Sequence, residues 1–167
     1  VPKWIFSLGT LDAQNMTPVI HDGVMYATAS HGKTYALNAS TGEEIWSYSH
    51  QLPEGVAGVM CCDIGNRGVA LYGDKVFVAT PDAHVVALNK SDGSVAWDVT
   101  VGDWEKAYTM TVAPLIVKGN VIVGLSGAEY PTRLYIEALD AETGKQAWRT
   151  YTIPGPGEPG HDSWGSA

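Results

Sequence analysis

The sequence of 167 residues contains little basic charge and no long apolar segment. Only 10 residues are lysine or arginine, against 18 aspartates and glutamates, and the basic residues form no cluster. This argues against a nucleic-acid partner, because phosphate binding needs a concentrated basic surface. No apolar run approaches the ~18 residues of a membrane-spanning helix, and no segment keeps a 3.6-residue hydrophobic period. We therefore expect neither a membrane span nor a long helix.

Cysteine and phenylalanine are scarce, with 2 residues each, whereas the chain has 6 tryptophans and 19 glycines. Hydrophobic residues still make up 45% of the chain, which is enough for one ordinary domain with a core. This composition is typical of a turn-rich globular protein and not of a disordered one. The cysteines lack a C-x-x-C spacing, which argues against a structural zinc site.

One pattern, A-L-[ND]-x-x-[TD]-G-x-x-x-W, occurs three times, at residues 36–46, 87–97 and 138–148. Each repeat reads as four short strands separated by turn residues. In the first repeat we expect the strands at Thr17–His21, Val24–Thr28, Lys33–Asn38 and Glu44–Ser49. Consecutive four-stranded antiparallel units predict an all-β fold, a β-propeller with blades over residues 17–49, 67–101 and 111–153.

The pattern tryptophans, Trp46, Trp97 and Trp148, are equally spaced, and each is expected to wedge between its own blade and the next. Trp4 fits the same role at the end of an earlier blade within residues 1–16. Three blades cannot close a ring. We therefore expect residues 1–167 to be one part of a single larger propeller domain with blades on both flanks. The Gly/Pro-rich residues 154–167 are expected to form a connector.

The third repeat carries five or six extra residues between its second and third strands, around Ser126–Glu129. The link before the second blade contains Cys61 and Cys62, the only cysteines. In a propeller, both of these connections lie at the end of the blade where the inner strand begins. The same end should collect the polar residues that open the three inner strands, which are Asn15, Arg67 and Thr111. This convergence predicts a site for a planar polyanionic ligand together with a metal ion.

Adjacent cysteines can be read in two ways. Neighbouring Cα atoms lie ~3.8 Å apart, closer than the ~4.4–6.8 Å that disulfides prefer. A bond between Cys61 and Cys62 would therefore close a strained ring and add little stability. It would be functional and would indicate an oxidising compartment. The alternative is a pair of reduced, buried thiols.

The histidines show no close spacing in the sequence, so we expect none of them to be a metal ligand or a catalytic base. They are His21, His31, His50, His84 and His161.

These motifs resemble those of the quinoprotein alcohol dehydrogenases, the pyrroloquinoline quinone (PQQ) enzymes that include methanol and ethanol dehydrogenases. The tryptophan pattern is similar to their tryptophan-docking motif, which non-enzymatic PQQ-like propellers share. The segments Cys61-Cys62-Asp63, Asn66-Arg67-Gly68 and Ser126-Gly127-Ala128-Glu129 are more specific. The resemblance covers essentially the whole chain and implies an eight-bladed propeller in the full protein.

The resemblance also implies roles for single residues. A vicinal disulfide between Cys61 and Cys62 would stack on PQQ, and Arg67 and Thr111 would hydrogen-bond it. Cofactor carboxylates would contact Ser126, Gly127 and Ala128. Glu129 would be a ligand of the Ca²⁺ or lanthanide ion that bridges to PQQ. Asn15 stands where the family commonly has glutamate; it keeps hydrogen-bonding capacity for the cofactor but loses the charge.

By resemblance, the function is PQQ- and metal-dependent oxidation of a small primary alcohol to an aldehyde in the periplasm. Electrons would pass to a cytochrome c, and a homodimer is left open. The family's catalytic aspartate is expected C-terminal to this chain, so none of the residues above is catalytic. The alternative is a non-catalytic propeller that serves as an assembly scaffold or sensor domain.

Overall fold

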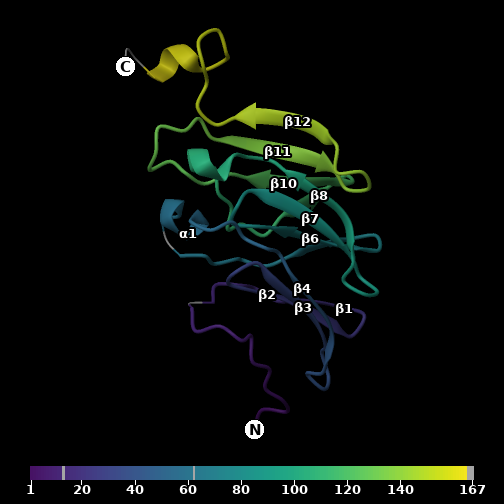
Figure 1. Cartoon of the computed structure of the whole chain (residues 1–167). Coiled ribbons are helices and arrows are strands. Elements are labelled where there is room, and N and C mark those ends of the chain that lie inside the picture. Colours follow the sequence, from purple (N-terminus) through teal and green to yellow (C-terminus); the bar gives the residue numbers. More distant parts are fainter. Residues whose placement is uncertain (13, 62, 165–167) are drawn as a thin grey trace.

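The computed structural model describes residues 1–12, 14–61 and 63–164. It contains three four-stranded sheets that follow one another along the molecule from the N-terminal to the C-terminal end (Figure 1). The first sheet comprises β1 (Val19–His21), β2 (Val24–Ala29), β3 (Lys33–Asn38) and β4 (Glu44–Ser49). The second comprises β5 (Ala70–Tyr72), β6 (Lys75–Ala79), β7 (His84–Asn89) and β8 (Val95–Thr100). The third comprises β9 (Leu115–Val117), β10 (Asn120–Gly124), β11 (Tyr135–Asp140) and β12 (Gln146–Tyr151).

In each sheet the strands pair antiparallel in chain order, as expected for a propeller blade. The helices in the described part of the chain are short: α1 (Val56–Val59) and two 3₁₀ helices, Trp104–Lys106 and His161–Trp164. None of them is long and apolar enough to span a membrane. The predicted all-β, partial-propeller fold without a long helix is confirmed.

The inner strands are shorter than the sequence suggested, since β1 begins at Val19 and not at Thr17. The reason is that the residues before these strands bond to the neighbouring blade. The amide of Thr17 donates to the carbonyl of Arg67 at 3.1 Å, and the amide of Arg67 donates to the carbonyl of Thr111 at 3.0 Å. The segments that lead into the three inner strands are thereby joined side by side.

The tryptophans dock one blade onto the next. The indole N–H of Trp46 donates to the Lys90 carbonyl at 2.9 Å, and that of Trp97 donates to the Ala141 carbonyl at 3.2 Å. Trp4 makes the corresponding bond to the Ala39 carbonyl at 3.2 Å, as expected for the end of an earlier blade. A Cβ on Gly93 would lie 2.6 Å from the Trp46 ring, so only glycine lets the ring pack against the next turn.

Each blade has a β-bulge opposite its tryptophan, at the same point of the repeat. The register shifts occur between Ala36 and Leu37, between Ala87 and Leu88, and between Ala138 and Leu139. A bulge bends the strand and redirects the neighbouring side chain. Its recurrence shows that the repeated sequence pattern encodes a repeated local geometry.

The core is divided between the blade interfaces. One buried cluster joins the first and second blades and includes Tyr26, Trp46 and Val78. A second cluster joins the second and third blades and includes Phe77, Met110 and Leu139. Burial of these side chains between sheets is the main stabilising contribution. It also fixes the relative positions of the loops at the blade ends.

Candidate functional site

A pocket of about 260 Å³ lies where the links before the three blades meet the long loop of the third blade. Its lining includes every predicted site residue that the structure describes: Asn15, Cys61, Arg67, Thr111, Ser126, Gly127, Ala128 and Glu129. Cys62 lies outside the described residues. The remaining lining residues, to which the sequence assigned no role, are Met60, Asp63, Gly65, Thr109, Val112 and Leu134. The structure therefore brings the described parts of these segments together around one pocket.

Arg67 and Thr111 form a single polar unit in this pocket. Besides the backbone bond between the two residues, the Arg67 Nη1 atom donates to the Thr111 carbonyl at 3.3 Å and contacts the Thr111 hydroxyl. A guanidinium group has five N–H donors, so these contacts leave several available. The pocket thus presents an oriented cation that can meet a carboxylate or a quinone oxygen.

The residues beside Arg67 hold its loop in place. Asn66 is buried; its side-chain amide donates to the Ala79 carbonyl at 2.7 Å and accepts from the Gly68 amide at 2.8 Å. Gly68 has φ +124°, and a Cβ there would lie 2.7 Å from the Thr17 carbonyl oxygen. Asn66 and Gly68 therefore position Arg67, a role that the sequence alone did not reveal.

The loop of the third blade spans residues 125–134, whereas the equivalent loops span only 30–32 and 80–83. It is pinned at Ser126, which exchanges two backbone hydrogen bonds with Thr109, of 3.2 and 2.8 Å. Gly127 adopts φ +131°, and a Cβ there would lie 2.2 Å from the Ala107 carbonyl oxygen. Its own carbonyl accepts from the Thr132 hydroxyl at 2.6 Å. These contacts hold the first residues of the long loop against the segment that contains Ala107 and Thr109.

Glu129 is exposed at the pocket edge and, among the described residues, has no hydrogen-bond or ion-pair partner. Asp63 supplies a second carboxylate to the same lining. Carboxylate oxygens suit hard cations such as Ca²⁺ or a lanthanide. The pocket therefore combines a cationic fork with carboxylates, a donor set that fits an anionic ligand bound together with a hard metal ion. The binding roles of the single residues stay predictions.

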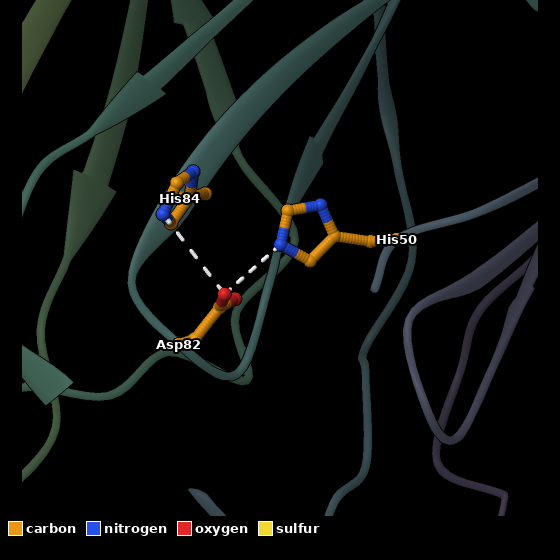
Figure 2. A group of neighbouring side chains, drawn as sticks. All are labelled: His50, Asp82 and His84. Carbon is orange, nitrogen blue, oxygen red and sulfur yellow. Dashed lines mark hydrogen bonds and ion pairs between the residues drawn. The ribbon is translucent and has the colours of Figure 1, made fainter. Parts of the chain in front are cut away.

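The structure also brings together two histidines that the sequence analysis set aside. His50 and His84 lie around Asp82, and their ligand atoms are all within 4.8 Å of one another (Figure 2). Sequence spacing gave no signal, because His50 and Asp82 are 32 residues apart and belong to different blades.

Comparisons with known proteins agree with this geometry. Residues 6–167 match the family described as "Glucose/ethanol/alcohol dehydrogenase, beta-propeller domain", of the PQQ type. The chain is 44% identical over 152 residues to a quinohemoprotein alcohol dehydrogenase, ADH IIB, of Pseudomonas putida; the match covers 91% of this chain and 22% of that protein.

Two solved structures carry the same arrangement of blades. Quinohemoprotein alcohol dehydrogenase ADHIIG of Pseudomonas putida HK5 is 46% identical, with a TM-score of 0.82, covering 86% of this chain and 21% of that one. A europium-containing methanol dehydrogenase is 33% identical, with a TM-score of 0.87, covering 90% of this chain and 27% of that one. This chain thus spans about a fifth to a quarter of the length of such proteins.

Proposed function

Because this chain belongs to the family of PQQ-dependent alcohol dehydrogenases, we propose that it provides part of the cofactor pocket of an enzyme that oxidises small primary alcohols to aldehydes. The observation that carries the proposal is the shared pocket of Cys61, Arg67, Thr111 and the loop 126–129. A propeller that served only as a scaffold would need the tryptophan contacts. It would have no use for an inserted loop whose glutamate has no partner among the residues that the structure describes.

The donor set of the pocket suits PQQ and a hard cation. Arg67 and Thr111 would bind and orient polar oxygens of the cofactor. The small residues Gly127 and Ala128 let the loop backbone approach a ligand closely. Glu129 would hold the metal ion, either Ca²⁺ or a lanthanide. When bound, PQQ would supply the two-electron redox chemistry, and the hard cation would supply Lewis acidity.

Asn15 is the point at which this pocket differs from the expected pattern. It is exposed in the lining, and its amide nitrogen lies near Gly65, 3.4 Å from where a Cβ of that glycine would be. An amide can donate and accept hydrogen bonds, whereas the glutamate common in the family would add a negative charge. We propose that Asn15 makes a neutral contact with the cofactor.

We further propose that the chain is a segment of a larger propeller. Trp148, which stands where Trp46 and Trp97 make their contacts, is 42% exposed, and Ile136 on the neighbouring strand of the third blade is 39% exposed. A following blade would cover this face in the same way as the third blade covers Trp97. The catalytic aspartate and the opposite wall of the pocket would lie in such further blades.

We also propose that Cys61 and Cys62 form a disulfide against the cofactor and that the enzyme works in the periplasm, where disulfides persist. Electrons would then leave to a cytochrome c. Thiol titration of the full-length protein, denatured without reductant, should find neither cysteine reactive. Two reactive thiols would contradict the disulfide and leave the rest of the pocket standing.

The proposed activity can be measured on the full-length protein that contains this chain. After reconstitution with PQQ and either Ca²⁺ or a lanthanide, it should reduce an artificial dye in the presence of a primary alcohol, and only when both additions are made. A protein that folds but binds no PQQ would instead support the non-catalytic propeller.

A further inference from the structure

The side chains of His50, Asp82 and His84 meet at the interface of the first and second blades, outside the pocket described above (Figure 2). His50 follows β4 of the first blade, whereas Asp82 lies in the turn between β6 and β7 of the second blade and His84 is the first residue of β7. The His50 Nε2 atom lies 3.0 Å from the Asp82 Oδ2 atom, and the His84 Nε2 atom lies 3.9 Å from the same oxygen.

The other ring nitrogen of each histidine already has a partner. The His50 Nδ1 atom lies 3.2 Å from the Tyr48 hydroxyl, and the His84 Nδ1 atom lies 2.7 Å from the Asp98 carboxylate. Metal-binding histidines are commonly oriented in this way, with one nitrogen on the ion and the other on a carboxylate or another polar group. These partners leave the Nε2 atoms to the centre of the cluster, where that of His50 contacts Asp82 and that of His84 lies between Asp82 and the Thr100 hydroxyl, 3.1 Å away.

Asp82 is buried, and both of its carboxylate oxygens have partners. Its side chain is only 4% exposed, and its second oxygen accepts a hydrogen bond of 2.6 Å from the Thr80 hydroxyl. The cluster is therefore closed to solvent at Asp82 and open at His84, whose side chain is 27% exposed.

We propose that His50, Asp82 and His84 bind a divalent transition-metal ion, of which Zn²⁺ is the best fit. Two imidazoles and a carboxylate suit Zn²⁺, Cu²⁺ or Ni²⁺, whereas Ca²⁺ prefers oxygen ligands alone. Around a tetrahedral Zn²⁺ the ligand atoms lie about 3.3 Å from one another, given metal–ligand distances of about 2.0–2.1 Å. The distances of 3.0 and 3.9 Å to Asp82 lie on either side of that value.

The ion would connect two blades and would keep one coordination position for water on the exposed side of His84. The Thr100 hydroxyl, 3.1 Å from the His84 Nε2 atom, lies beside this position and could hydrogen-bond that water. The site does not depend on PQQ or on the proposed alcohol oxidation. Its ligands also differ in kind from Glu129, so the two sites should select different metals.

The test is a titration with Zn²⁺ of the full-length protein, stripped with a chelator and kept in excess Ca²⁺. Three variants are compared with the parent protein. His84→Asn removes one ligand from a partly exposed position, and Asp98→Asn removes only the outer partner of His84. The matched control is His31→Asn. His31 also meets a carboxylate, with 2.7 Å between its Nε2 atom and the Asp12 Oδ2 atom, but in the described ranges it belongs to no group of three ligand residues.

We expect the parent protein and His31→Asn to bind one Zn²⁺ per chain at this site and to melt at a higher temperature with the ion. Asp98→Asn should weaken binding about 10- to 100-fold, as loss of an outer partner commonly does, and His84→Asn should weaken it further. Co²⁺ should give a visible absorption band in the parent that His84→Asn lacks. Equal Zn²⁺ binding by the parent and His84→Asn, or no binding by the parent, would overturn the proposal and identify the cluster as an ion pair only.

Discussion

The second and third blades have the same strand order, the same bulge and the same tryptophan pattern, but they differ in two places. The second blade is covered on both faces, by Trp46 from the first blade and by the third blade that receives Trp97. The third blade is covered on one face, and Trp148 on the other is 42% exposed. The loops between the second and third strands also differ, because residues 80–83 form a short turn and residues 125–134 a long loop.

The loops between the second and third strands occupy the same position of the repeat in both blades, but their carboxylates have different surroundings. In the second blade, Asp82 is buried and satisfied by His50 and Thr80. In the third blade, Glu129 is exposed at a pocket and, within the described part of the chain, has no partner. The strands thus form a uniform frame in both blades, whereas the chemistry depends on which loop is lengthened. Loops on a rigid scaffold commonly carry function in this way.

The sharpest difference in stability should come from the tryptophans. Trp46→Ala removes a ring that is 7% exposed, so we expect it to lower the free energy of unfolding of the full-length protein by about 3–5 kcal/mol. If a following blade covers Trp148 in the whole propeller, Trp148→Ala should cost a similar amount. Chemical denaturation of both variants measures this. A cost within about 0.5 kcal/mol for Trp148→Ala, as at ordinary surface positions, would contradict a covering blade.

A smaller effect is expected at the glycine that shapes the long loop. Gly127→Ala places a Cβ against the Ala107 carbonyl at a positive φ, and we expect it to cost about 1–3 kcal/mol and to reduce PQQ binding. The matched control is Gly124→Ala, since a Cβ at Gly124 would meet nothing within 4 Å. Thermal melts and bound PQQ give the comparison. Identical behaviour of the two variants would mean that the loop is not held as described.

The smallest effect is expected when the guanidinium group of Arg67 is replaced. Arg67→Lys keeps the charge but replaces a planar donor group with a point charge, so PQQ affinity should fall about tenfold. Arg149→Lys is the control, because Arg149 pairs with Glu137 at 2.7 Å on an outer strand and does not line the pocket. Spectroscopic titration with PQQ measures both. Unchanged affinity in Arg67→Lys would identify Arg67 as a residue of the blade edge only.

Much of the frame could be predicted from sequence, because the signals are local. Turn residues and strand patterns gave β3 and β4 to the residue, Lys33–Asn38 and Glu44–Ser49. The starts of the inner strands could not be predicted, since Thr17 and Arg67 bond across blades and not within their own sheet.

The residues that line the pocket could be predicted from sequence, because the topology of the repeat brings the segments before each blade and the inserted loop to the same end of the blades. Two features escaped prediction. The positioning role of Asn66 depends on a buried contact with Ala79, and the His50–Asp82 contact joins residues from different blades. Tertiary contacts of this kind leave no periodic signal in a single sequence.

The central claim is that the long loop of the third blade provides a metal ligand of a PQQ site, and Glu129→Gln tests it most directly. The variant keeps the shape of the side chain and removes its charge. Metal and PQQ content of the purified full-length protein would be measured by mass spectrometry and absorption, beside Glu54→Gln, an exposed loop glutamate outside the pocket.

We expect Glu129→Gln to bind Ca²⁺ or a lanthanide more than about 100-fold more weakly, because even the loss of an outer partner commonly costs 10- to 100-fold. Alcohol-dependent dye reduction should fall with it, while the far-ultraviolet spectrum stays native and Glu54→Gln behaves as the parent protein. Full metal occupancy and full activity in Glu129→Gln would contradict the account and move the metal site elsewhere.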